Sequence, residues 1–387
     1  MTILAGVRRL PSLTALALLA PAVPLVVALI ARRHPIWVPD LDLALTELRV
    51  RDVGGAHSPL VGLPGRIGTL EEQGSHPGPI SFYLLAPVYR LLGGTAFALQ
   101  AATVALHAAA AVVTVGLVRR QAGRAWAVAV SAALVAFIAG IGPGLFTEPW
   151  NPHLPLLWWP ACLAGVWCAL QGDSVGLPVV VLAGAICGQT HVPYLGPVAV
   201  LTGVAVVGWI RRSSGSRRVR HLGGALLLTA TLWVPPLVDQ VTRDPGNASL
   251  LADHLLSPSE PAIGVREGAR LVFEHLDLAH LLRSAVVDPG RLGERYPSGA
   301  SAGRGALVAA AVGATIVAGH RRAGRAARGA GVVAAVAGGA ALVAATRIVG
   351  YPWAYLLLWL WPVALAAALA AMATGLEQRW RPWMPGR

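Results

Sequence analysis

The sequence contains no lysine and little charge of either sign. Charged residues make up 13% of its 387 residues, against roughly 25% in a typical soluble domain. All 31 basic residues are therefore arginine, and they exceed the 18 acidic residues by 13. Together with a hydrophobic content of 55%, this composition excludes an ordinary soluble domain and indicates a membrane protein.

The sequence also lacks the motifs of common soluble enzymes. Its three cysteines, Cys162, Cys168 and Cys187, lie inside apolar runs, and an odd number without ligand spacing argues against a disulfide framework or a zinc site. It has no Walker loop, no H-E-x-x-H and no G-x-S-x-G pattern, and no dinucleotide-binding glycine motif in a suitable unit. ATP hydrolysis, nicotinamide chemistry and zinc proteolysis are therefore not expected.

The sequence does contain a series of apolar runs of about 15 to 22 residues, the length that crosses a bilayer core of about 30 Å. The first run follows Arg8 and Arg9 and is too long for the apolar core of a cleaved signal peptide. We therefore interpret it as a retained signal anchor. The expected fold class is all-α, a polytopic integral membrane protein of about ten transmembrane helices. The predicted spans are 10–31, 97–118, 125–145, 154–170, 177–194, 196–210, 222–238, 303–319, 329–346 and 355–373.

Arginine clusters orient these spans, because basic residues are retained on the cytoplasmic side of a membrane. With the amino terminus inside, the inner side holds 17 arginines but only two acidic residues, Asp173 and Glu377. We therefore predict a multi-pass protein of the cytoplasmic membrane with both termini in the cytoplasm. The basic loops then face anionic membrane lipid, and nucleic acid is not an expected partner.

Two outer segments are too long to be simple connections. They cover residues 32–95 and 239–302 and hold 15 of the 18 acidic residues. Long loops in a compact protein are usually functional or disordered, and apolar stretches such as Ile80–Leu92 are expected to form interfacial helices. The predicted parts are a membrane domain, 1–238, with a catalytic module in the outer loop 32–95, an extracytoplasmic loop, 239–302, and carboxyl-terminal helices with a cytoplasmic tail, 303–387.

Two of the predicted spans, 303–319 and 329–346, consist almost entirely of Ala, Gly and Val. In lipid the hydrophobic effect does not drive helices together, and small residues let their backbones approach closely. This pattern predicts tight helix packing in the carboxyl-terminal part.

The first outer segment contains a pattern that predicts a short helix beginning near Asp42. On such a helix Asp42 and Arg49, seven residues apart, point the same way, and Glu47 and Arg51 are spaced for an ion pair. A carboxylate can take a proton from an attacking hydroxyl, and a guanidinium can hold a phosphate leaving group. The alternative interpretation of Asp42 is a helix N-cap.

Asp40 and Asp42 also form a D-x-D triplet, which is suited to a hard cation such as Mg²⁺ or Mn²⁺. A metal, if there is one, is predicted at Asp40, Asp42 and Glu148.

Four motifs carry a resemblance to a known family. They are D-x-A-L-x-E-L-R-x-R-D-V-G at Asp42–Gly54, H-P-G-P at His76–Pro79, P-W-N-P at Pro149–Pro152 and Q-T-H-V at Gln189–Val192. Over residues 1–210 the chain resembles the GT-C superfamily of membrane glycosyltransferases, which includes protein O-mannosyltransferases and aminoarabinose transferases. It looks most like an actinobacterial branch. Gly78 stands where the family has the second proline of H-P-P.

The resemblance implies transfer of a sugar from a polyprenyl-phosphate donor to a lipid or glycan acceptor of the cell envelope, on the extracytoplasmic face. It also implies that Asp42 is the catalytic base. Asp40 and Glu148 are further catalytic candidates. The predicted substrate-binding residues are Arg49, Arg51, His76, Asn151, Gln189 and His191.

Each of these positions also has a structural interpretation. The loop around Glu148 and Asn151 is an ordinary interfacial turn, His76 is a possible cap of the turn before Pro77, and Gln189 and His191 suit interhelical hydrogen bonds. The rival functions are a lipid or solute transporter, which would place polar residues at the bilayer midplane, and a non-catalytic partner subunit. The gathering of acidic residues in the outer loops favours the enzyme.

Overall fold

The chain folds almost entirely into helices, as the composition predicted. The computed structural model describes residues 13–33, 37–69, 72–258, 260–294 and 299–380. Helices account for 74% of residues and strands for 3%. The predicted start of the first span, residues 10–12, lies outside the described residues.

The amino-terminal half alternates long helices with short outer elements. Its elements are α1 (Leu13–Leu19), α2 (Ala22–Ala31), α3 (Leu41–Asp52), β1 (Pro64–Gly68), β2 (Gln73–Ser75), α4 (Ile80–Leu91), α5 (Ala96–Ala122), α6 (Arg124–Ile141), η1 (Pro143–Thr147), α7 (Trp158–Leu170), α8 (Gly176–Thr190), η2 (Val192–Tyr194) and α9 (Leu195–Ile210).

The carboxyl-terminal half places four short helices between long ones. Its elements are α10 (Gly215–Thr242), α11 (Asn247–Leu256), α12 (Gly264–His275), α13 (Leu278–Val287), α14 (Arg291–Glu294), α15 (Ala302–Gly319), α16 (Arg325–Thr346), η3 (Ala354–Leu356) and α17 (Leu360–Trp380).

Six helices in the described part of the chain are long and apolar enough to cross a membrane. They are α5, α6, α9 with η2, α10, α15 and α16. The first predicted span is broken into α1 and α2, which meet at 48° and are long and apolar enough for a crossing only when taken together. The other three predicted spans correspond to α7, α8 and α17, which are apolar helices below the length of a full crossing in their described parts.

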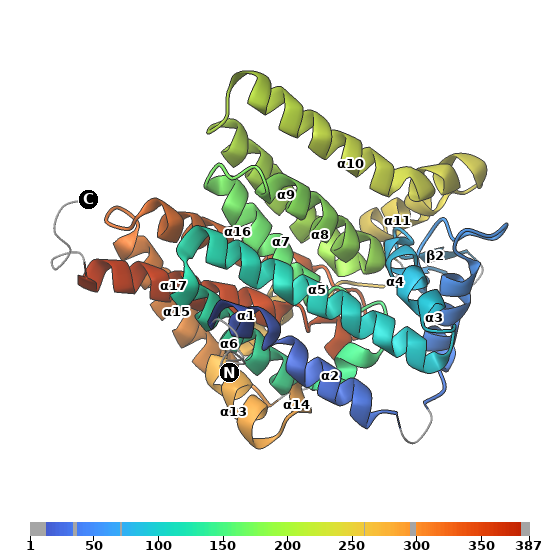
Figure 1. Cartoon of the computed structure of the whole chain (residues 1–387), viewed down its shortest axis with the longest axis horizontal. Helices are drawn as coiled ribbons and strands as arrows, with labels where there is room; N and C mark the ends of the chain where they lie inside the picture. Colours follow the sequence, from blue (N-terminus) through green and yellow to red (C-terminus); the bar gives the residue numbers. More distant parts are fainter. Residues whose placement is uncertain (1–12, 34–36, 70–71, 259, 295–298, 381–387) are drawn as a thin grey trace, which may run out of the picture.

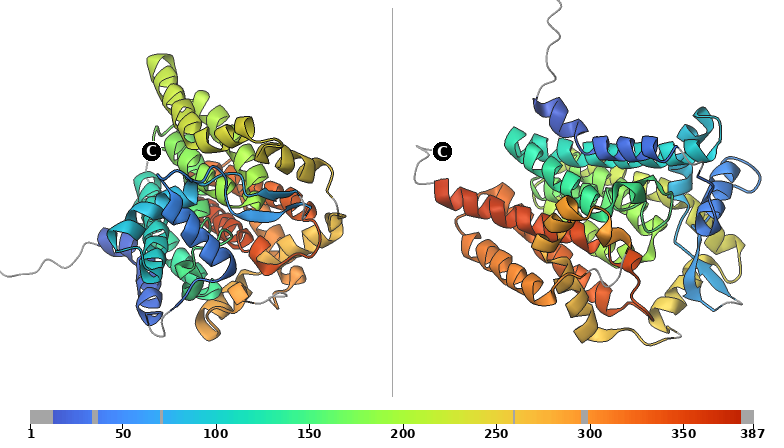
Figure 2. Two further views of the ribbon diagram at one scale, coloured as in Figure 1. Left: turned by 90° about the vertical axis from the view of Figure 1, so that its right-hand side faces the viewer. Right: turned by 90° about the horizontal axis from the view of Figure 1, so that it is seen from below.

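The two long outer segments meet at one end of the bundle. Figure 1 shows α3, α4, β2 and α11 grouped there, and Figure 2 shows the same grouping from two other sides. Asn247 joins the two segments: its Oδ1 accepts from the Ser75 amide at 2.7 Å and its Nδ2 donates to the Ser75 carbonyl at 3.1 Å. The predicted helices of the first segment are present as α3 and α4, and the antiparallel β1–β2 hairpin between them was not predicted.

The arginine-bearing connections meet at another part of the molecule. Arg120 pairs with Asp173 at 2.6 Å, between the α5–α6 and α7–α8 connections. Arg217 donates to the Gly172 carbonyl at 2.9 Å, and Gln171 donates to the Arg325 carbonyl at 3.4 Å. Four connections that the charge pattern assigned to the inner side are therefore in mutual contact.

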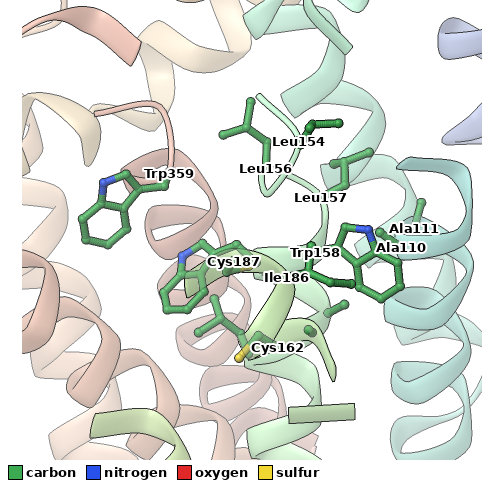
Figure 3. Close-up of a cluster of buried hydrophobic side chains, with 14 of the residues drawn as sticks. Ala110, Ala111, Leu154, Leu156, Leu157, Trp158, Cys162, Ile186, Cys187 and Trp359 are labelled. Carbon is green, nitrogen blue, oxygen red and sulfur yellow. The ribbon is translucent and has the colours of Figure 1, made fainter. Parts of the chain in front are cut away.

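The core lies among α5, α7, α8 and α17 and continues into the loop before α7. Figure 3 shows part of it, where Leu154, Leu156 and Leu157 of that loop belong to the same buried cluster as Trp158, Ile186 and Trp359. All three leucines are buried, so the segment that follows the P-W-N-P motif is fixed by packing rather than free. The three cysteines are buried and unpaired, as expected for packing residues.

Glycine lets α12 approach two other helices closely. A Cβ on Gly305 of α15 would lie 2.6 Å from the carbonyl carbon of Phe273 in α12. A Cβ on Gly268 of α12 would lie 2.7 Å from the backbone nitrogen of Thr346 in α16. Both distances are shorter than any normal contact, so only glycine permits these helix crossings.

Candidate functional site

Helix α3 presents Asp42 from its first turn. Asp40 holds the N-cap position without a side-chain capping bond, and Thr46 Oγ1 donates to the Asp42 carbonyl at 2.8 Å. Among the described residues, Leu41 is the only non-glycine with a positive φ, 44°. That backbone region is costly for a branched side chain and is concentrated at functional sites. The conformation of Leu41 thus sets the direction of Asp42.

Three side chains fix α3 against α4. The Tyr89 hydroxyl donates to Glu47 at 2.7 Å, and Arg51 donates to Tyr89 at 2.8 Å and to Glu47 at 2.7 Å. The hydrogen bonds to Tyr89 and Glu47 raise the pKa of Arg51, and burial raises the pKa of Tyr89. The predicted Glu47–Arg51 pair is confirmed. Arg51 therefore links α3 to α4 through Tyr89.

The carboxylate of Asp42 is bound by a residue from a distant motif. Trp150, 108 residues further along the chain, donates its indole N–H to Asp42 Oδ2 at 2.9 Å. The other carboxylate oxygen, Oδ1, has no hydrogen-bond donor within the described part of the chain. An indole N–H can orient a carboxylate without neutralising its charge, so this pair holds a carboxylate with one oxygen available.

Glu148 lies beside this pair and has its own partners. Arg32 donates to it at 2.9 Å, and His153 Nδ1 is 3.5 Å from its second oxygen. Burial alone would raise the pKa of Glu148, but the contacts with His153 and Arg32 outweigh it and lower the pKa. Glu148 is thus an ionised carboxylate already bound by protein groups.

A row of aromatic and histidine rings extends from Trp150 toward the start of α9. Trp150 contacts His153 and Tyr355, with ring centroids at 4.9 Å and 5.0 Å. Tyr355 lies 6.4 Å from the ring of His191, which lies 5.2 Å from the ring of His76. This aromatic row joins residues of the P-W-N-P, Q-T-H-V and H-P-G-P motifs to a loop that precedes α17.

The row includes buried polar atoms without partners. Both ring nitrogens of His191, the hydroxyl of Thr190 and the side-chain oxygen of Gln189 have no hydrogen-bond partner among the described residues. Buried polar groups are nearly always hydrogen-bonded, because leaving one unpaired costs about 1–3 kcal/mol. Such a concentration marks a place where a polar ligand would be favoured.

His76 is held as a neutral ring at the edge of the row. Its Nδ1 accepts a hydrogen bond from the Val192 amide at 3.3 Å, which places the ring proton on Nε2. Burial lowers the pKa of His76 to about 4. The neutral form is thus favoured by folding, and this contribution to stability is lost as the pH falls from about 6.5 toward 4.

Gly78, where the chain departs from the family pattern, packs directly on Gln189. Its amide donates to the Gln189 carbonyl at 3.0 Å, a bond that proline cannot make. A Cβ at this position would lie 2.7 Å from Gln189 Cδ. The side chain of Gln189 is in turn held by its bond to the Leu232 carbonyl at 2.8 Å. The observed position of the Gln189 side chain therefore requires a residue without a Cβ at position 78.

We expect Gly78→Ala to destabilise the protein by about 1–3 kcal/mol, because the buried Gln189 must leave its place. Adding Gln189→Ala should recover part of the loss, since contacting residues are not additive. Thermal unfolding of the single and double variants measures this. Gly196→Ala is the control, because a Cβ there meets no atom within 4 Å. Unchanged stability of Gly78→Ala would contradict the predicted contact.

The remaining predicted residues are placed differently. Asp40 is exposed, and Arg49 is exposed with no hydrogen bond or ion pair to any described residue. Asn151 is buried beside Trp150. Gln189 makes the interhelical hydrogen bond that was the alternative interpretation of this position. Arg347, which follows α16, donates to the Leu255 carbonyl at 2.7 Å.

Sequence reasoning missed Trp150, His153 and Tyr355 as members of the site. Trp150 lies inside the P-W-N-P motif and His153 directly follows it, but a tryptophan and two prolines are also ordinary at a membrane interface. Tyr355 stands at the start of the last predicted span, 355–373, and nothing in its local sequence distinguishes it from other interfacial aromatics.

Comparison with family models, with curated proteins and with solved structures found no match in any of the three.

Proposed function

We propose that the chain is a membrane glycosyltransferase of the GT-C type. It would move a sugar from a polyprenyl-phosphate donor to a lipid or glycan acceptor of the cell envelope. The observation that carries the proposal is the hydrogen bond from Trp150 to Asp42, which joins two of the four motifs of the resemblance at the predicted catalytic base. The aromatic row adds the other two motifs through His191 and His76.

In the proposed reaction Asp42 Oδ1 takes the proton of the acceptor hydroxyl as the acceptor oxygen attacks the anomeric carbon. The bond from that carbon to the phosphate oxygen breaks, and the polyprenyl phosphate leaves as an anion, with inversion at the sugar. Arg49, on the same face of α3 and about 10 Å along it, is the cation available to the departing phosphate. Arg51 is the less suited cation, because its charge is already paired with Glu47 and it also binds Tyr89.

A metal is not used in this reaction scheme. Asp42 is bound to Trp150 and Glu148 to Arg32, and within the described ranges no three acidic, histidine or cysteine side chains form a group that could hold a metal ion. Asp42 and Glu148 thus already have protein partners, and no step of the scheme is assigned to a metal.

The proposal includes the membrane placement. All ten predicted segments would cross, with α1 and α2 as one bent crossing and the short helices α7, α8 and α17 as three more. Both termini and the arginine-bearing connections would be cytoplasmic, and Asp42 extracytoplasmic. The contacts of three arginine-bearing connections with the α7–α8 connection support a single basic side.

The test is turnover by the wild-type protein in liposomes. The purified full-length protein receives a panel of labelled polyprenyl-phosphate sugars and a crude envelope-lipid acceptor, and both released polyprenyl phosphate and labelled product are measured. We expect at least one donor to be consumed. A second readout follows movement of intact donor between leaflets. Movement without cleavage would identify a transporter, and the absence of both cleavage and movement would favour a partner subunit.

A further inference from the structure

A second polar site lies where the arginine-bearing connections meet. A cavity of about 610 Å³ is lined by Gln171, Gly172, Arg211, Arg212, Arg217 and Arg325. An adjoining cavity of about 350 Å³ shares Arg212 and Arg325 and adds Arg328. The proposed glycosyltransferase reaction uses none of these residues.

The positive charge of these cavities is not compensated by protein groups. Neither cavity is lined by a carboxylate. The acidic residue of these connections, Asp173, is bound to Arg120, Gln121 and the Val175 amide. The guanidinium of Arg325 makes no hydrogen bond or ion pair with any described residue. Its N–H groups are therefore left for a ligand of the cavity.

The backbone holds part of the basic site in a fixed geometry. Arg212 donates one N–H to the Gly208 carbonyl at 3.0 Å, and Arg217 donates one to the Gly172 carbonyl at 2.9 Å. Arg217 also lies over the ring of Trp209, 6.0 Å from its centroid. Each guanidinium carries five N–H groups, so both retain donors for a ligand. A planar guanidinium matches the oxygens of a phosphate.

An apolar groove begins at the same helix contact. It has a volume of about 450 Å³ and lies between α5 and α6 on one side and α16 and α17 on the other, with α7 at its base. Trp167 and Ala326 line the groove, and Trp167 donates to the Ala326 carbonyl at 2.8 Å. One turn further along α7, Gln171 lines the basic cavity and donates to the carbonyl of Arg325. The basic cavity and the groove thus occupy successive turns of one α7–α16 contact.

We propose that this site binds an anionic phospholipid. Its phosphate would lie between Arg212 and Arg325, and one acyl chain would occupy the groove along Trp167, Ala330 and Val333. Charge complementarity selects an anionic headgroup, and the groove selects a ligand that carries a hydrocarbon chain. The site is independent of the proposed sugar transfer.

The full-length protein in nanodiscs tests the proposal. Discs are made with phosphatidylcholine alone or with added phosphatidylglycerol, and retained lipid is measured by native mass spectrometry after extraction. We expect selective retention of phosphatidylglycerol. The pair Arg212→Gln and Arg325→Gln should weaken that retention by about tenfold or more, since each arginine is worth roughly 1 kcal/mol near an anionic surface.

Two matched controls separate a defined site from diffuse charge. Arg321→Gln with Arg322→Gln removes the same charge from exposed positions that line neither cavity, and should leave retention unchanged. Ala330→Phe fills the groove with every arginine in place, and should abolish selective retention. Equal losses in both arginine pairs, or no preference for phosphatidylglycerol over phosphatidylcholine, would overturn the proposal. The proposal would also be overturned if inorganic phosphate stabilised the protein as much as the lipid does while Ala330→Phe still retained phosphatidylglycerol.

Discussion

Asp42→Asn is expected to lower the rate of sugar transfer by about a hundredfold or more, the scale of a lost general base. The substitution is well matched to the geometry. An asparagine side-chain oxygen can still accept the Trp150 indole N–H that binds Asp42 Oδ2 at 2.9 Å, so the helix and the side chain keep their places. What is lost is the ability to take a proton. Turnover of the polyprenyl-phosphate donor by the purified variant measures the effect.

Asp40→Asn is the control for this variant. Asp40 is two residues away on the same segment, carries the same charge, is exposed, and makes no side-chain capping bond. It should retain nearly full activity. If both variants transfer sugar at the wild-type rate, Asp42 is not the base. If both lose activity equally, the effect arises from the charge of the segment rather than from proton transfer.

Gly305→Ala is expected to give the largest loss of stability. The added Cβ would lie 2.6 Å from the carbonyl carbon of Phe273, and backbone atoms of a packed helix cannot move aside as a flexible side chain can. The position is further constrained, because the neighbouring Arg304 donates to Asp277 at 2.7 Å and the Ser301 amide donates to the same carboxylate at 2.9 Å. We expect a loss of about 3 kcal/mol or more.

Thermal unfolding in detergent measures this loss as a fall of at least about 5 °C in the apparent melting temperature. Gly313→Ala is the matched control: it lies on the same helix, α15, and a Cβ there meets no atom within 4 Å. Gly313→Ala should be neutral or slightly stabilising, since alanine favours a helix. A Gly305→Ala protein as stable as the control would show that α12 and α15 do not cross as described.

Local patterns predicted the helical elements well. Apolar runs placed helical structure at each predicted span, because the long helices of a membrane protein are predominantly apolar. Six helices of the described part are long and apolar enough to cross a membrane. The pairing of Glu47 with Arg51 followed from helical spacing alone. The β1–β2 hairpin was missed because its strands are short and contain glycines, with no alternation of apolar and polar residues. The lengths of α7 and α8 were overestimated because apolar turns flank them.

The candidate site was only half visible in the sequence. Motif residues such as Asp42 and His76 were found because they stand in recognisable local patterns. Their contacts were not, because Trp150 reaches Asp42 across 108 residues and no local signal encodes such a pairing. Tyr355 was missed for the same reason. Arg51 was predicted as a substrate residue from its charge, and its bonds to Glu47 and Tyr89 became apparent only with α4 in place.

The aromatic row sets an order for the assembly of the protein during synthesis. Chains emerge from the ribosome amino terminus first, so α3 exists before Trp150 and long before Tyr355. Asp42 lacks its indole partner until α6 has been made. The contact of Trp150 with Tyr355, at 5.0 Å between ring centroids, forms only after α16. A nascent chain therefore carries no finished candidate site at any earlier stage, and the aromatic row is completed only once the loop before α17 has been made.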